Sequence, residues 1–293
     1  MKNITNPKYK YVFFGSPEFA AIVLAKLIAA QDPPLLVITN PDRPQGRKKE
    51  IIPPPAKIVA KENRIPVWQP ETLSREELIK HTGDADLGLV AAYSQILKED
   101  VLGTFPLGIL GLHPSLLPKY RGASPIQSAL MQGEEEAGVS LYVMDEKMDH
   151  GPVLGETKVE VEEIDDYFSL EKKLAGAGAE LFLKLINEFT GGKLNPLPQD
   201  ESQVTFTKKV STQDAFIPPD EILKAKSDLA LAVQIMNKIR ALVKEPGAWT
   251  WGNAFPELQI PSDKRVKILL ANKKEGAFRI LKIQVEGKSP RGI

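Results

Sequence analysis

The sequence contains no cysteine in its 293 residues and only three histidines. The absence of cysteine excludes a disulfide framework, a thiolate nucleophile and a zinc site built from thiolates. No run approaches the roughly 18 apolar residues of a membrane span, and the first residues show no apolar stretch typical of a secretory signal. We therefore expect a cytoplasmic protein that takes no membrane as its partner.

Net charge is also absent, since 38 Lys and Arg residues balance 38 Asp and Glu residues. A balanced charge argues against nucleic acid as a partner. The balance is a cancellation, because residues 204–293 carry 16 basic against 9 acidic residues, a net +7, whereas residues 1–203 carry 22 against 29, a net −7. This division predicts a basic part that meets a polyanion and an acidic part that does chemistry; the alternative is scattered charge that only aids solubility.

Short apolar runs alternate with helical patterns over the first two-thirds of the chain, which indicates an α/β fold with a mostly parallel sheet. Ser16 suits the N-cap of a helix that runs from Phe19 to Ala30. The Pro-rich, basic stretch 40–55 has no periodicity and predicts a long loop. Buried strands are expected at residues 11–14, 35–39, 86–91 and 108–112.

A segment rich in Gly, Pro and polar residues, 191–205, predicts the junction between two domains. We expect residues 1–203 to form a Rossmann-like domain and residues 204–293 to form a small β-rich barrel. The apolar runs at 266–270 and 278–285 favour the β-rich character of the second domain.

The three histidines are the main groups that titrate near neutral pH. His81 lies in a polar stretch and is expected at the surface, whereas His113 follows an apolar strand, where a parallel sheet presents its functional loops. His150 follows Asp149 in a predicted turn. Asp149 could orient a histidine base, or these side chains could bind a metal together with His113, and the spacing leaves both open. Glycine-rich nucleotide motifs and a Gly-x-Ser-x-Gly elbow are absent, which argues against NAD, ATP and esterase chemistry.

Two strings around these histidines resemble the active-site signature of the folate-dependent formyltransferases: HPSLLPKYRG at 113–122 and MDEKMDHGP at 144–152. AYSQIL at 92–97 resembles the pterin-side segment of that superfamily. Within the superfamily, FFGSPEFA at 13–20 and NPDRPQGR at 40–47 are similar to the methionyl-tRNA formyltransferases. The resemblance extends from about Tyr11 to Thr207 and is weaker beyond. It implies that residues 1–203 form the catalytic domain and that residues 204–293 form a shortened, OB-like β-barrel that binds tRNA.

The resemblance implies transfer of a formyl group from 10-formyltetrahydrofolate to the α-amino group of methionyl-initiator-tRNA, for translation initiation, by a monomer without a metal. It implies that His113 handles the proton and that Asp149 orients His113. A base suits this reaction, because the acceptor amine has a reference pKa of about 7.7–8.0 and is partly protonated at neutral pH. The resemblance further implies tRNA contacts at Arg43, Arg47, Lys48 and Lys49. Its folate-side residues are Tyr93, Ser94, Gln95, Ile96 and Leu97, followed by Ser115, Leu116, Leu117 and Pro118.

Gly111 departs from the family pattern, which has Asn-x-His where this chain has Gly111-Leu112-His113. The asparagine is expected to donate a hydrogen bond to the oxyanion, and loss of one such donor lowers turnover by about 10²–10³-fold. A missing donor predicts that Gly111→Asn raises the rate. Three interpretations stay open: a formyltransferase of reduced activity, a replacement donor such as water or His150, and a catalytically silent tRNA- or folate-binding homologue. A formyltransferase that acts on a small amine, such as glycinamide ribonucleotide or an amino sugar, is the nearest enzymatic alternative.

Overall fold

The computed structural model describes residues 9–45, 49–274 and 277–293. The chain forms two compact units. The second unit contains the C-terminal part of the chain and two short earlier segments, Gly122–Ala137 and Glu160–Leu170. The domain boundary expected at residue 203 stays a prediction. The first unit comprises Met1–Arg121, Gly138–Val159 and Glu171–Phe206, and the second comprises Gly122–Ala137, Glu160–Leu170 and Thr207–Ile293.

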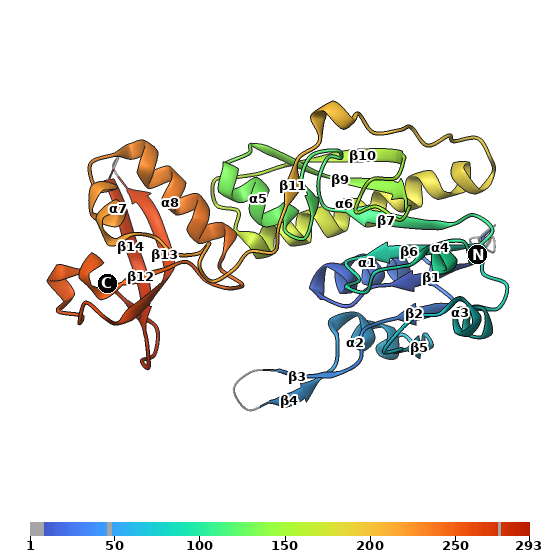
Figure 1. Cartoon of the computed structure of the whole chain (residues 1–293), viewed down its shortest axis with the longest axis horizontal. Coiled ribbons are helices and arrows are strands. Elements are labelled where there is room, and N and C mark those ends of the chain that lie inside the picture. Colours follow the sequence, from blue (N-terminus) through green and yellow to red (C-terminus); the bar gives the residue numbers. More distant parts are fainter. Residues whose placement is uncertain (1–8, 46–48, 275–276) are drawn as a thin grey trace. The chain divides into compact units, whose positions relative to one another are not determined.

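The first unit is built on a seven-stranded sheet with the order β10-β9-β7-β6-β1-β2-β5 (Figure 1). The middle strands are parallel to one another, and only β9 is described as antiparallel, to β7. This arrangement confirms the predicted Rossmann-like, mostly parallel sheet. The strands are β1 (Tyr11–Phe14), β2 (Leu36–Ile38), β5 (Val67–Trp68), β6 (Leu87–Ala91), β7 (Ile109–His113), β9 (Glu136–Val143) and β10 (Val153–Glu160).

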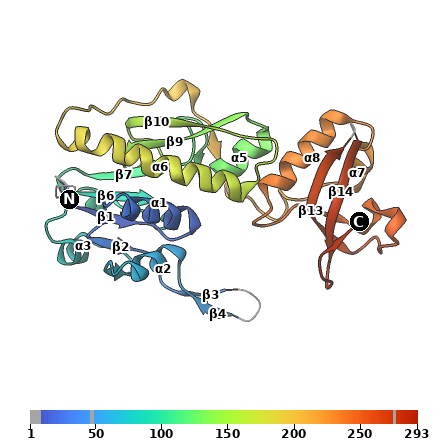
Figure 2. The same ribbon diagram turned by 180° about the vertical axis from the view of Figure 1, so that it is seen from behind.

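Helices cover both faces of this sheet. Successive residues of a strand point to opposite faces, so the neighbours of β1 side chains show what packs on each face. Val12 and Phe14 of β1 belong to a buried cluster with Leu78 of α3 and Val101 of α4. On the opposite face the ring of Tyr11 lies 5.4 Å from that of Phe182 in α6, and Figure 2 shows α1 and α6 over one face of the sheet. The continuous apolar run of β1 therefore reflects burial on two sides. The helices are α1 (Glu18–Ala29), α2 (Pro55–Glu62), α3 (Arg75–Thr82), α4 (Glu99–Leu102) and α6 (Tyr167–Thr190).

Two local predictions in this unit are wrong. Pro17 is the N-cap of α1 and makes no side-chain capping bond, whereas Ser16 accepts a hydrogen bond from the backbone N–H of Asn40 at 2.9 Å. The stretch 40–55, predicted as a loop, contains a hairpin of β3 (Arg43–Gln45) and β4 (Glu50–Ile52), with Arg43 paired to Ile52. Strands of three residues are too short to show a periodic pattern, so this hairpin left no signal in the sequence.

The second unit contains an antiparallel sheet with the order β12-β13-β14-β15, packed with helices. Its core joins Ile235 and Ile239 of α8 to Val266 of β13 and Ile283 of β14. The predicted small, β-rich C-terminal part is confirmed, and its sheet has four strands. The elements are β12 (Trp249–Trp251), β13 (Arg265–Lys274), β14 (Ala277–Val285), β15 (Arg291–Gly292), α5 (Pro125–Gln132), α7 (Pro219–Lys224) and α8 (Leu229–Ala241).

The remaining elements are short. β8 (Arg121–Gly122) pairs with β11 (Phe206–Thr207), and single 3-10 turns occur at Glu201–Gln203, Gly252–Ala254 and Pro256–Leu258. Within the described ranges, no helix combines the length and the hydropathy that crossing a bilayer requires.

Candidate active site

His113 is the last residue of β7, at the carboxyl edge of the parallel strands, and only 6% of it is exposed. Its Nε2 lies 2.9 Å from the backbone oxygen of Tyr120. A carbonyl oxygen only accepts, so Nε2 carries a proton and donates it. Nδ1, which faces a carboxylate oxygen of Asp149 at 3.5 Å, is therefore the ring nitrogen that can gain or lose a proton.

Asp149 lies in the turn that joins β9 to β10, with a φ of 49°. The short polar side chain of aspartate tolerates this left-handed backbone. Two residues later, a Cβ on Gly151 would lie 1.8 Å from the backbone oxygen of Val143, so only glycine fits there. The N–H of Val143 closes the turn by donating to Pro152 O at 2.9 Å. The tight backbone of the turn thus presents Asp149 to His113.

Tyr142 on β9 lies directly opposite Gly111 on β7. Its hydroxyl donates a hydrogen bond of 2.9 Å to Asp149 Oδ1, the same oxygen that faces His113 Nδ1. Burial and the charge of Asp149 raise the pKa of the Tyr142 phenol well above its usual value, so the phenol stays protonated at neutral pH and acts as a donor. The sequence analysis missed Tyr142, because only the pairing of β7 with β9 reveals that it faces Gly111.

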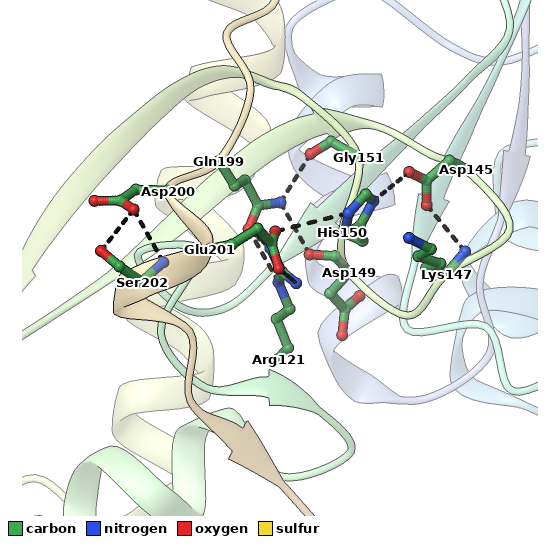
Figure 3. A network of polar contacts seen from close by, with 10 residues as sticks. All are labelled: Arg121, Asp145, Lys147, Asp149, His150, Gly151, Gln199, Asp200, Glu201 and Ser202. Atoms are coloured by element: carbon green, nitrogen blue, oxygen red, sulfur yellow. Dashed lines mark hydrogen bonds and ion pairs between the residues drawn. The ribbon is translucent and has the colours of Figure 1, made fainter.

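A polar network holds the turn of Asp149 from the other side (Figure 3). Gln199 Nε2 donates to the backbone oxygens of Asp149 and Gly151, at 2.9 and 2.8 Å. Arg121, 2% exposed, donates to Gln199 Oε1 at 2.8 Å and to Glu201 Oε1 at 2.7 Å. The hydrogen bond from Arg121 lowers the pKa of the Glu201 carboxyl below its usual range. Residues 199–201, which lie far from the turn in sequence and carry no recognisable motif, therefore support it.

His150 belongs to the same network. Its Nδ1 lies 2.6 Å from Asp145 Oδ2, and its Nε2 lies 3.7 Å from Glu201 Oε1, so both ring nitrogens face carboxylates (Figure 3). Across the ranges for which coordinates are described, no three His, Asp or Glu side chains are grouped in a way that could hold a metal ion. The geometry gives His150 a place in the turn, and its suggested role as a replacement donor stays a prediction.

Replacing Gln199 with leucine is expected to destabilise this turn. The change keeps a side chain of similar size but removes the two hydrogen bonds to the backbone of Asp149 and Gly151 and the acceptor of the buried Arg121, at about 1 kcal/mol each. Urea unfolding should show a free energy of unfolding lower by about 3 kcal/mol. Gln203→Leu, at an exposed position of the neighbouring 3-10 turn, is the matched control. Equal stability of Gln199→Leu and the wild type would contradict the support that we assign to Gln199.

The two segments expected on the folate side follow neighbouring parallel strands. Residues 92–97 follow β6 and residues 114–118 follow β7, so both segments begin at the same carboxyl edge, where ligands of open α/β sheets bind. Ile96 is 88% exposed, and Ser94 accepts a hydrogen bond from Asn40 Nδ2 at 2.8 Å. The Tyr93 hydroxyl is buried without a hydrogen-bond partner among the described residues, and burial raises its pKa to about 12.

The side chains of residues 115–118 mainly build their own loop. The Ser115 hydroxyl donates to Lys119 O at 2.6 Å, and Leu117 N donates to Ser140 Oγ at 2.9 Å. The Leu116 side chain packs closely on Gly138, since a Cβ on Gly138 would lie 2.3 Å from Leu116 Cδ2. Leu117 is buried, and its peptide bond to Pro118 is cis. Backbone groups of this loop also make internal hydrogen bonds, since Ser115 N donates to His113 O and Leu116 O accepts from Lys119 N, and the folate contact of the loop stays a prediction.

Of the four basic residues expected to contact tRNA, Arg43 and Lys49 are described, whereas Arg47 and Lys48 lie outside the described residues. Arg43 begins β3 and pairs with Glu71 at 2.6 Å, with 63% of its side chain exposed. The preceding Asp42 is anchored by Lys57 of α2, also at 2.6 Å, and this hydrogen bond lowers the pKa of the Asp42 carboxyl. The base of the hairpin is thus fixed to the first unit.

Comparison with known proteins adds to this geometry. Residues 9–186 match the family model described as formyl transferase. The chain is 36% identical to a methionyl-tRNA formyltransferase of Kosmotoga olearia over 95% of this chain and 93% of that protein, and 35% identical to one of Macrococcus caseolyticus over 95% and 92%.

Solved structures with lower identity share the fold. HypX from Aquifex aeolicus, in complex with tetrahydrofolic acid, superposes with a TM-score of 0.62 at 16% identity, over 91% of this chain and 38% of HypX. An N-formyltransferase from Helicobacter canadensis, in complex with folinic acid and dTDP-3-aminofucose, superposes with a TM-score of 0.58 at 21% identity, over 93% and 95%.

Proposed function

This chain belongs to the methionyl-tRNA formyltransferase family, and we propose that it transfers the formyl group of 10-formyltetrahydrofolate to the α-amino group of methionyl-initiator-tRNA in the cytoplasm. The observation that carries the proposal is the His113–Asp149 pair, 3.5 Å apart at the carboxyl edge of the sheet, in a chain that matches these enzymes over nearly its whole length. The two residues to which the resemblance gives the proton-handling and orienting roles therefore lie next to each other.

An acceptor amine that starts as the ammonium loses two protons in the reaction, one before it attacks and one after the new C–N bond has formed. An α-amino group has a reference pKa of about 7.7–8.0, so much of it is protonated at neutral pH and is not nucleophilic. We assign the acceptance of the first proton to His113 Nδ1, because Nε2 is held by Tyr120 O. The Asp149 carboxylate, which faces Nδ1, stabilises the imidazolium that results.

10-Formyltetrahydrofolate supplies the formyl carbon that the amine attacks. The C–N bond to the folate nitrogen then breaks, and that nitrogen takes up the proton that His113 removed from the ammonium. The second proton of the acceptor nitrogen leaves to solvent, so the reaction balances. The fit of this donor rests on the buried Tyr93 hydroxyl, which lacks a partner among the described residues, and on the exposed Ile96 of the same segment. We assign residues 92–97 and the backbone of 115–118 to folate binding.

The tRNA side is assigned to the basic hairpin that begins at Arg43. Arg43→Ala is expected to raise the KM for methionyl-tRNA by about 10-fold, because one charge-assisted contact to a phosphate is lost. The KM for 10-formyltetrahydrofolate should stay within about 2-fold, since charge contacts act locally at physiological salt. Lys80→Ala is the control, because Lys80 is an equally exposed cation paired with Glu76 on α3. Equal increases in both KM values for Arg43→Ala would contradict the assignment.

A second candidate, a formyltransferase of reduced activity or a silent binding protein, is favoured by Gly111, which lacks the oxyanion donor that the family pattern has at this position.

The test of the proposed function is an assay of the purified chain with 10-formyltetrahydrofolate, labelled in the formyl group, and charged initiator tRNA. Label that appears in N-formylmethionine after release from the tRNA supports the enzyme. Binding of both substrates without labelled product supports the silent protein and contradicts the proposed function.

A further inference from the structure

The phenol of Tyr142 fills the space into which a side chain at position 111 would project. A Cβ built on Gly111 would lie 2.5 Å from Tyr142 Cε1, 2.6 Å from its Cζ and 2.9 Å from its hydroxyl oxygen. All three distances are shorter than any ordinary contact of a Cβ. The Tyr142 ring in this position therefore requires glycine at 111.

The pairing of β7 with β9 places this phenol on the catalytic side of the sheet. Gly111 pairs with Tyr142, and two residues further along, His113 pairs with Ser140. Residues directly opposite in an antiparallel pair project from the same face, and so do residues two apart on one strand. The Tyr142 ring is therefore on the face that carries His113.

The contacts of the hydroxyl show what it does there. It donates to Asp149 Oδ1 at 2.9 Å, and that oxygen lies 3.5 Å from His113 Nδ1. Tyr142 is only 3% exposed, so water does not readily replace this bond. A carboxylate that accepts a hydrogen bond from a fixed phenol loses rotational freedom about its own side-chain torsions.

We propose that Tyr142 is a positioning residue for formyl transfer: its hydroxyl holds the Asp149 carboxylate against His113, and its ring replaces the side chain that is missing at Gly111. This inference rests on the proposed function. It also changes the expectation for Gly111→Asn, because the asparagine Cβ would collide with the ring. Gly111→Asn alone should lower the rate of transfer rather than raise it.

The test is a comparison of Tyr142→Phe with the wild type in the formylation assay. The variant keeps the ring and removes the one hydroxyl, so kcat should fall by about 10-fold, the effect of one hydrogen bond to a charged group, while both KM values stay within about 2-fold. Tyr9→Phe is the matched control, since the buried Tyr9 hydroxyl also donates to a carboxylate, Asp32 Oδ2, at 2.7 Å. It should retain the wild-type kcat.

A double-variant cycle separates positioning from a merely structural role. Gly111→Ala should lower kcat by displacing the ring, and in the Tyr142→Phe background the same change should cost less than about 2-fold, because the hydroxyl is already gone. Independent, multiplying losses would overturn the proposal, as would a Tyr142→Phe variant with the wild-type kcat.

An exchange variant keeps the test decisive if Gly111→Ala folds poorly. Gly111→Asn combined with Tyr142→Ala returns an amide to the vacated space and should exceed the kcat of Tyr142→Ala alone; a lower value would contradict the replacement. A wild-type chain that gives no formylated product would instead contradict the proposed function itself, so the two failures are distinguishable.

Discussion

His113→Ala is expected to lower the single-turnover rate of formyl transfer by about 10³-fold, within the range of general acid–base catalysis. The change removes Nδ1, the nitrogen that faces Asp149 Oδ1, and the Tyr142 phenol that remains on that oxygen is a hydrogen-bond donor whose raised pKa keeps it from acting as a base at neutral pH. Rapid-quench measurement with enzyme in excess of charged tRNA reports this step without product release.

His81→Ala is the histidine control for this measurement. His81 is exposed and stacks on Trp68 with ring centroids 4.0 Å apart, and its Nδ1 lies 2.8 Å from Glu77 O on its own helix rather than against a carboxylate. It should react at the wild-type rate. A loss of less than about 10-fold for His113→Ala, below the usual contribution of a catalytic base, would contradict its proton-handling role.

Asp149→Asn is expected to lower the same rate by about 10²–10³-fold, less than the effect known for the carboxylate of a serine protease triad. The amide keeps the shape of the side chain and still accepts the hydrogen bond of Tyr142, but it carries no charge to stabilise the His113 imidazolium. Binding of both substrates should be retained.

The control for this change is Asp84→Asn, which removes a surface carboxylate that pairs with Lys10. If Asp149→Asn and Asp84→Asn gave equal rates, the orienting role of Asp149 would be refuted. A loss of substrate binding instead of rate would assign Asp149 to recognition.

The sequence predicted the parts of the fold that depend on local pattern. The apolar runs at 11–14 and 86–91 became β1 and β6, because strands buried on both faces must be apolar throughout. The hairpin of β3 and β4 was missed, since its pairing depends on a partner strand rather than on periodicity. The cap at Ser16 was wrong because its hydroxyl is committed to Asn40 instead.

The candidate site shows the same division. His113 could be placed at a strand end from the sequence, and the resemblance supplied Asp149, but a separation of 36 positions established no contact. Their proximity follows from the antiparallel pairing of β7 and β9, which also brings Tyr142 over Gly111. Gln199 donates to the backbone of Asp149 from 50 positions further along the chain, and no spacing rule predicts that contact.

The charge division also bears on the acceptor. The net +7 of residues 204–293 and the basic hairpin at Arg43 suit an acceptor that carries many phosphates. A small amine acceptor would need neither. The choice of acceptor is therefore the claim on which the proposed function depends most.

The most direct test of that claim compares kcat/KM for three acceptors with the same 10-formyltetrahydrofolate: methionyl-initiator-tRNA, glycinamide ribonucleotide and a dTDP-linked amino sugar. An acceptor that carries many phosphates should be preferred by at least about 100-fold, which corresponds to about 2.7 kcal/mol of binding to the transition state. A kcat/KM for either small amine that equals or exceeds the value for methionyl-initiator-tRNA would contradict the account.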